Sequence, residues 1–279
     1  MTKNKTNSIN LIGASGFPYQ IRVQHEVEVH SERHGWAVVA PELRWTDAST
    51  GSDGYADLVV EKDDTRLILE CKKAKESPKW VFLIPRHKWQ EEGGLSSATN
   101  ARLFWTSHEE MEGWADIKVA PTSFRSAYCV IDRKLDQANY MLEKICNSLL
   151  LSVESVARQE LKTKNRRSIG FFIFYAAVIV TNAELEVCLL DPEDINLHSG
   201  TVEHGTEPPG CLREVQWIRF QKSLFSTARS PAADNLKGVN VQDERTVFVV
   251  RGDSLASFLE NWNARNTDFV QSWLQVNPR

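Results

Sequence analysis

The fold is decided by two runs of sequence, YADLVV at residues 55–60 and LILECK at residues 67–72. Both runs are rich in aliphatic and β-branched side chains, which favours strands. The polar segment 62–65 between them is short enough to be a tight turn. The two runs therefore predict a β-hairpin, and the rest of the chain can be placed around it.

The second strand of this hairpin carries charged residues at alternate positions. Because side chains alternate along a strand, Glu70 and Lys72 share one face, and Leu69 and Cys71 enter the opposite, apolar face. Asp57 stands on the partner strand, where the hairpin brings it near the same edge. Two converging carboxylates repel each other unless a cation lies between them, and such oxygen ligands suit Mg²⁺. The alternative is a solvated ion pair in an ordinary hairpin.

The regions that flank the hairpin predict both helices and strands. The first sixteen residues are rich in Thr, Asn, Lys, Ser and Gly, which is typical of a flexible lead-in. Residues 74–125 hold four tryptophans without a sustained period, and we interpret them as an insertion. The remaining predicted elements are a helix over 19–34 closed by Gly35, a strand over 36–43, a short strand over 127–132, a long helix over 135–156, a fully covered strand over 169–180, and later strands followed by a helix from Ser254.

Three segments result from this pattern. Residues 1–16 are the flexible lead-in, residues 17–180 form the core with its insertion at about 74–125, and residues 181–279 form a β-rich extension that ends in a helix. Strands that alternate with helices predict an α/β fold with a mixed sheet flanked by helices.

The hairpin residues resemble the active site of the PD-(D/E)xK nuclease superfamily, which includes restriction endonucleases, Mrr-like enzymes and RecB-like nucleases. The resemblance rests on Asp57, on Glu70-x-Lys72, and on an upstream helix that carries a glutamate. It implies a restriction endonuclease-like core in the order helix, three strands, helix, strand. It also implies that Asp57, Glu70 and the main-chain carbonyl of Cys71 bind a metal ion, and that Lys72 positions the attacking water.

Other positions of the family pattern have candidates in this chain. Glu26 lies closer than Glu28 to the centre of the apolar stripe of the first helix, so we predict Glu26 as the helical glutamate that binds the metal. Gln137 and Tyr140 are possible accessory residues, at a spacing one residue shorter than the usual one. Ala56 stands where the name of the motif has proline.

The charge distribution adds candidate nucleic-acid contacts. The net charge of −4 excludes a uniformly basic binder, but residues 72–88 hold six basic side chains and one acid, and residues 158–167 hold five and one. Such a basic segment, interleaved with tryptophans, is typical of contact with a phosphate backbone, although a solvated loop has the same composition. The possible contacts are Lys73, Lys75, Lys79, Arg86, His87, Lys88 and Trp89.

Histidine and cysteine patterns are less specific. His30 and His34 are four residues apart and could share a metal ion, but packing against the sheet explains them as well. The five cysteines form no CxxC pair, which favours reduced thiols. With no secretion-type apolar segment, we expect a cytoplasmic protein without a membrane partner.

Together these features predict a Mg²⁺-dependent nuclease, with Mn²⁺ as a substitute, that hydrolyses DNA. The resemblance implies an endonuclease in a bacterial restriction or anti-phage defence setting. Double-stranded DNA is a better candidate than single-stranded DNA, and a homodimer or a partner protein of such a system is compatible. The alternatives are an RNA-cleaving nuclease and a non-catalytic nucleic-acid-binding or interaction module on the same fold.

Overall fold

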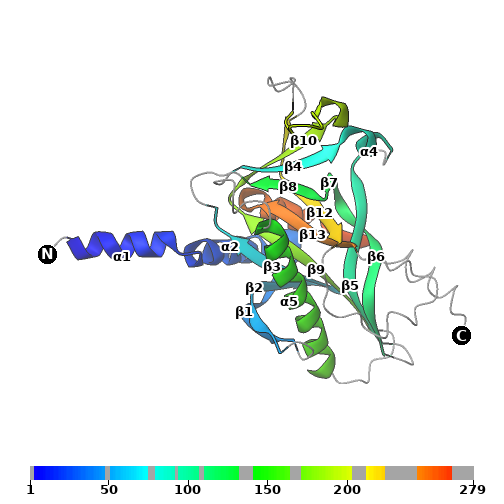
Figure 1. Cartoon of the computed structure of the whole chain (residues 1–279). Helices are drawn as coiled ribbons and strands as arrows, with labels where there is room; N and C mark the ends of the chain where they lie inside the picture. Colours follow the sequence, from blue (N-terminus) through cyan, green and yellow to red (C-terminus); the bar gives the residue numbers. More distant parts are fainter. Residues whose placement is uncertain are drawn as a thin grey trace, which may run out of the picture.

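The computed structural model describes residues 3–47, 51–74, 79–91, 94–106, 110–131, 141–163, 171–202, 212–223 and 244–265. It is an α/β structure in which helices lie on both sides of a large mixed sheet (Figure 1), as predicted. The helices are α1 (Lys3–Ala14), α2 (Phe17–Val29), α3 (Ser31–His34), α4 (Arg86–Glu91), α5 (Met141–Thr163) and α6 (Leu255–Asn261). Within the described ranges, no helix has the length and apolar character needed to cross a membrane.

Ten strands of the described chain form the larger sheet. They are β1 (Ala37–Thr46), β2 (Asp53–Lys62), β3 (Thr65–Lys72), β5 (Ser96–Thr106), β6 (Glu110–Ser123), β7 (Arg125–Ser126), β9 (Phe171–Thr181), β12 (Trp217–Ser223), β13 (Glu244–Arg251) and β14 (Asn263–Arg265). The main order is β1-β2-β3-β9-β13-β12-β7. Off this path, β5 pairs with β9, β6 pairs with β5, and β14 pairs with β6. β1, β2 and β3 are an antiparallel meander, whereas β9 runs parallel to both β3 and β13.

The predicted hairpin is present as β2 and β3. Lys62 pairs with Thr65, so the turn consists of Asp63 and Asp64 alone. Asp63 has φ of +51°, in the left-handed region that aspartate tolerates better than most residues. The strands are thus longer, and the turn is shorter, than the four-residue connection that we predicted from composition.

Strand β9 is the centre of the larger sheet. Every residue from Ile173 to Val180 is buried. A strand with parallel neighbours on both sides needs cover on both faces of the sheet. α5 packs on one face, and α2 and α6 pack on the other. The prediction of a strand covered on both faces is confirmed.

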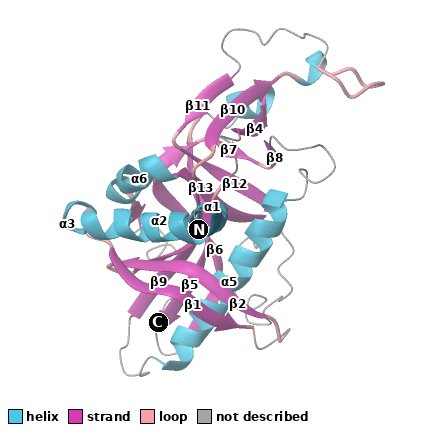
Figure 2. Cartoon of the chain, turned by 90° about the vertical axis from the view of Figure 1, so that its left-hand side faces the viewer, coloured by secondary structure: helices cyan, strands magenta, loops and turns pink. Residues whose placement is uncertain are grey.

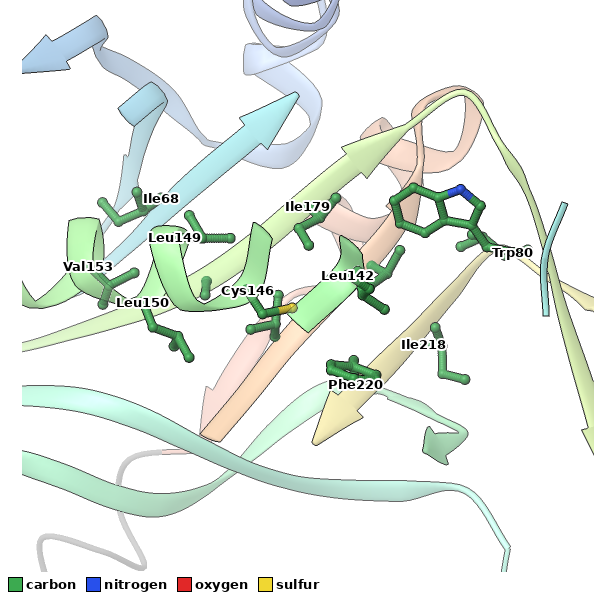
Figure 3. Packing of buried hydrophobic residues seen from close by; sticks show 14 of the residues in the cluster. Ile68, Trp80, Leu142, Cys146, Leu149, Leu150, Val153, Ile179, Ile218 and Phe220 are labelled. Atoms are coloured by element: carbon green, nitrogen blue, oxygen red, sulfur yellow. The ribbon is translucent and has the colours of Figure 1, made fainter. Parts of the chain in front are cut away.

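Helix α5 supplies the first cover with one apolar stripe. Six apolar residues of α5 are at most 1% exposed, and they are Leu142, Cys146, Leu149, Val153, Val156 and Ala157. Figure 3 shows the stripe against Ile68 of β3 and Ile179 of β9. Burying one such leucine stabilises the fold by roughly 1.5–3 kcal/mol. The predicted start of this helix, with Gln137 and Tyr140, lies outside the described residues.

Helices α2 and α6 supply the second cover. Val23 and Val27 of α2 are buried against β2 and β3, and Phe258 of α6 packs beside them over β13. The indole Nε1 of Trp36 donates to the Leu259 carbonyl at 3.0 Å and so joins α6 to the start of β1. Elements from both ends of the described chain therefore share this core.

A smaller sheet joins the regions predicted as insertion and extension. Its strands are β4 (Lys79–Pro85), β8 (Tyr128–Ile131), β10 (Glu184–Leu190) and β11 (Leu212–Val215). Their order is β11-β10-β4-β8, with β10 parallel to β4. Residues 74–125 also supply β5, which pairs with β9, and residues 181–279 supply β13 and, after α6, β14. Both segments therefore contribute strands to the core sheet. The sequence did not indicate this, because pairing between strands that are distant in sequence produces no local periodicity.

The predicted flexible lead-in contains helix α1. This helix projects from the rest of the structure in Figure 1 and points toward the viewer in Figure 2. It ends at Ala14 because Pro18 lacks the N–H that would donate to the Ala14 carbonyl. Composition alone was a poor guide here, since small polar residues are compatible with a helix as well as with a coil.

The helix predicted over 19–34 is divided in two. α2 ends at Val29, and α3 follows as one short turn that Gly35 closes with φ of +75°. The Gly35 N–H donates to the Ser31 carbonyl at 2.8 Å. This is the left-handed cap that was predicted from the sequence.

The cap gives a stability prediction. We expect Gly35→Ala to lower the free energy of unfolding by about 1 kcal/mol, because φ of +75° is unfavourable for a residue with a Cβ. Gly35→Asn should cost less, since asparagine tolerates this region. Urea denaturation measures both. As a control, Gly13→Ala adds a Cβ that meets nothing within 4 Å, and a loss as large as that of Gly35→Ala would contradict the explanation.

Candidate active site

Asp57, Glu70 and Lys72 lie together at the end of the β2–β3 hairpin. The main-chain ladder between the two strands ends one residue short of Asp57. Beyond that point, the Cys71 N–H donates to Asp57 Oδ2 at 2.7 Å. The carboxylate thus replaces a main-chain acceptor, and this hydrogen bond holds it beside the Glu70–Lys72 segment.

The environment of Asp57 disfavours its charged form. Burial, followed by the negative charge of Glu70, raises the pKa of the Asp57 carboxyl to about 6. The hydrogen bond from Cys71 and the positive charge of Lys72 act in the opposite direction. Two carboxylates therefore share a part-buried site in which their mutual repulsion is incompletely compensated.

Lys72 and Glu70 form an ion pair across one position of β3. The side chains of Lys72 and Glu70 are 37% and 18% exposed, whereas Leu69 and Cys71 lie in the core below α2. The predicted alternation is confirmed. The ion pair that we considered as the alternative is also present, but it lies beside the part-buried carboxyl of Asp57 rather than in solvent alone.

The donor set fits a hard divalent cation. Asp57 and Glu70 supply carboxylate oxygens, and Cys71, between Glu70 and Lys72, supplies the carbonyl predicted as a further ligand. Among the described residues, no group of three or more His, Cys, Asp or Glu side chains is arranged to hold a metal ion. Mg²⁺ is commonly held by one or two carboxylates and completed by water, whereas structural zinc needs four protein ligands. Asp57 and Glu70 match this number of carboxylates.

The structure does not bring Glu26 to this site. Its carboxylate pairs with Arg22 at 2.7 Å and with His30 at 3.0 Å, both on its own side of α2. The other candidate, Glu28, accepts a hydrogen bond from Gln24 at 2.8 Å. The offset from the apolar stripe was the wrong criterion, because the hairpin edge lies near the first turn of α2 rather than near its middle.

Gln20 and Tyr19 are the residues of α2 that reach the hairpin edge. Gln20 Nε2 donates to the Asp57 carbonyl at 3.0 Å. The Tyr19 hydroxyl is buried, has no hydrogen-bond partner within the described part of the chain, and faces Gly252. Burial and the nearby Cys71 raise the pKa of Tyr19. Sequence reasoning missed both, although their position one turn before Val23 placed them on the buried side.

The segment after Lys72 is fixed on two sides. Lys73 donates to the Gly13 carbonyl at the end of α1. The Ala74 N–H donates to Asn182 Oδ1 at 2.6 Å, and Asn182 Nδ2 donates back to the Ala74 carbonyl at 3.3 Å. Lys72 is therefore followed directly by two anchored residues.

The residues predicted to contact nucleic acid have different environments in the structure: some are exposed, one forms an ion pair, and one packs against another ring. Arg86, His87 and Lys88 are exposed on α4. Lys79 pairs with Glu186 at 2.7 Å. The Trp89 ring stacks on Phe124 with centroids 4.7 Å apart, so its placement indicates packing rather than contact with a base. Lys75 lies outside the described residues.

His30 and His34 have separate environments. His30 pairs with Glu26, whereas His34 is buried and its Nδ1 accepts from the Trp36 N–H at 3.0 Å. Burial lowers the pKa of His34. The packing interpretation therefore describes His34 better than a shared metal site does.

The chain matched no protein-family model, no curated protein and no solved structure. Its candidate function therefore rests on the residues and geometry given above.

The raised pKa of Asp57 predicts a pH-dependent gain for Asp57→Asn. In the folded state the pKa is about 6, above the ordinary value of 3.8, so the folded protein favours the protonated carboxyl. The resulting stabilisation is complete below about pH 4 and is lost as the pH rises through 6. We expect Asp57→Asn, in a chelator, to raise the free energy of unfolding by about 1–2 kcal/mol at neutral pH and by almost nothing near pH 4.

The matched control is Asp53→Asn on the same strand, where the carboxylate pairs with Arg44 and is 54% exposed. This variant should show no gain at neutral pH. Thermal unfolding at a series of pH values measures both variants, and an equal response of the two would contradict the described environment of Asp57.

Proposed function

We propose that the chain is a Mg²⁺-dependent nuclease of the PD-(D/E)xK type that hydrolyses DNA phosphodiester bonds, with Mn²⁺ as a possible substitute. The observation that carries the proposal is the convergence of the Asp57 carboxyl with Glu70 and Lys72 at one end of the hairpin. The setting implied by the resemblance is restriction or anti-phage defence.

The strand arrangement supports this proposal. The chain order α2, β1, β2, β3, α5, β9 is interrupted by the one-turn helix α3 between α2 and β1 and by the elements from β4 to β8 between β3 and α5, and β9 returns parallel to β3. A restriction endonuclease-like core requires this order, a helix on each face, and charged residues at the end of its third strand. The two apolar cores supply the helices, and Glu70 and Lys72 occupy that strand end.

The roles of the residues follow from their contacts. Asp57 and Glu70, with the Cys71 carbonyl, would hold Mg²⁺, which when bound offsets negative charge on the phosphoryl oxygens. Lys72, held by Glu70, would donate a hydrogen bond to the attacking water and aim its oxygen at phosphorus. A new phosphorus–oxygen bond would form as the attacking water releases a proton to solvent, and the bond to the sugar oxygen would break as that oxygen takes up a proton from solvent. Gln20 would hold the Asp57 main chain in place.

Cleavage assays with single-residue variants test the proposal. We expect Asp57→Asn, Glu70→Gln and Lys72→Ala each to lower the rate of Mg²⁺-dependent plasmid cleavage by about 100-fold or more, the usual effect of removing a catalytic group. The controls are Lys222→Ala and Glu143→Gln. These residues form a comparable ion pair, with Lys222 37% and Glu143 20% exposed, away from the hairpin. Their rates should stay within about threefold of wild type.

Metal binding provides a second readout that does not require turnover. We expect Mg²⁺ to raise the melting temperature of the wild type and not that of Asp57→Asn, because binding to the folded state alone stabilises it. Metal-dependent cleavage that survives Asp57→Asn and Lys72→Ala would overturn the site. Cleavage of RNA alone would change the substrate. Mg²⁺ binding without cleavage of DNA or RNA would favour a non-catalytic module.

A further inference from the structure

The two N-terminal helices carry an unusual share of exposed apolar side chains. Among the described residues, thirteen large hydrophobic side chains are exposed, and six of them lie in α1 and α2. The six are Ile9, Leu11, Ile12, Phe17, Ile21 and Val29. Phe17 and Ile21 lie one turn apart on the side of α2 opposite the buried Val23 and Val27, and they are 62% and 67% exposed. Packing within one chain does not explain why these apolar side chains of α1 and α2 are exposed.

Helix α1 has little support from the rest of the chain. It projects alone in Figure 1, and the contact that ties its end to the sheet is the hydrogen bond from Lys73 to the Gly13 carbonyl. It has twelve residues. Isolated helices shorter than about 12–15 residues are marginal in water, and in proteins their stability comes from packing of an apolar face. The exposed side chains of α1 therefore need a covering surface.

We propose that a second copy of the chain covers this N-terminal arm, defined as residues 3–29, in an antiparallel two-fold pair. A two-fold interface is self-complementary, so the arm must offer matching groups in both directions from its centre. If Ile9 of one copy faces Ile21 of the other, the two-fold axis passes near Ser15. Apolar residues then stand on both sides of the axis, with Ile12 opposite the first turn of α2.

The charges of the arm fit the same register. α1 contains Lys3 and Lys5 and no acidic residue, whereas the end of α2 contains Glu26 and Glu28. In this register, positions 3 and 5 of one copy lie level with positions 27 and 25 of the second copy, so the basic end of α1 meets the acidic end of α2. A parallel pair would place lysine against lysine. Charge complementarity thus favours the antiparallel second copy over other occupants.

The pair would also act on the candidate site, although the proposal itself does not rest on nuclease activity. Lys73, bound to the end of α1, directly follows Lys72, and Gln20 of α2 binds the Asp57 main chain. An arm held by a second copy would therefore fix two hairpin edges relative to each other.

Sedimentation velocity of the full chain tests the pair. We expect a dimer for the wild type and a monomer for the variant with Ile9→Asp and Ile21→Asp, whose dissociation constant should rise by about 100-fold or more because each substitution acts twice. The control is Leu197→Asp, which changes a fully exposed leucine outside the arm and should leave the dimer intact. Circular dichroism should show unchanged folding for both variants.

Two further variants test the register. Lys3→Glu with Lys5→Glu should weaken the dimer about tenfold, and addition of Glu28→Lys should restore it. Gly16 is near the proposed axis, and a Cβ there meets nothing within 4 Å. Gly16→Cys should form a disulfide-linked dimer under mild oxidation, whereas Leu197→Cys should not.

A monomeric wild type at about 100 μM would overturn the proposal, as would a dimer unaffected by Ile9→Asp and Ile21→Asp. In either case, loss of binding to duplex DNA or to anionic lipid vesicles by the same variant would identify a different covering partner. Because these measurements need no catalysis, failure of the arm pair and failure of the proposed nuclease can be told apart.

Discussion

The burial of β9 on both faces is the constraint on which the rest of the structure depends. A strand between two parallel neighbours has no face for water, so helices must cover both sides of the sheet. Parallel strands also end at the same edge. Lys72 pairs with Thr181, and Thr181 pairs with Arg251, so the charged end of the hairpin lies where these strands finish. The position of the candidate site follows from the packing of β9.

The parts of the fold that could be predicted are those with short-range causes. The hairpin was visible because two apolar runs enclose a polar turn, and the face of Glu70 follows from strand alternation. β9 was visible because its apolar run is too short to span a membrane and rich in strand-forming residues. Each of these signals lies within about twenty residues, which is also why Asp57 could be placed beside Glu70.

The parts that could not be predicted depend on long-range placement. Glu26 and Gln20 are both polar residues of one helix, and which of them reaches the hairpin depends on where α2 crosses the sheet. Trp89 was predicted to contact a base, but in the structure its ring stacks on Phe124, which is distant in sequence. The pairing of β5 with β9 and of β10 with β4 joins segments far apart in sequence, so the apparent insertion and extension had no local mark of their place in the core.

The negative charges of Asp57 and Glu70 are only partly compensated at the candidate site. The Cys71 N–H needs an acceptor, and a neutral side-chain oxygen can also accept this hydrogen bond. A negative charge at position 57 is therefore not required by the hydrogen bond, and it is opposed by burial and by Glu70. Lys72 compensates one of the two carboxylates, which leaves a formal charge of about −1 in a part-buried position at the sheet edge. A divalent cation compensates that charge without filling apolar space, which is why the repulsion within the pair supports a metal-binding function rather than a purely structural one.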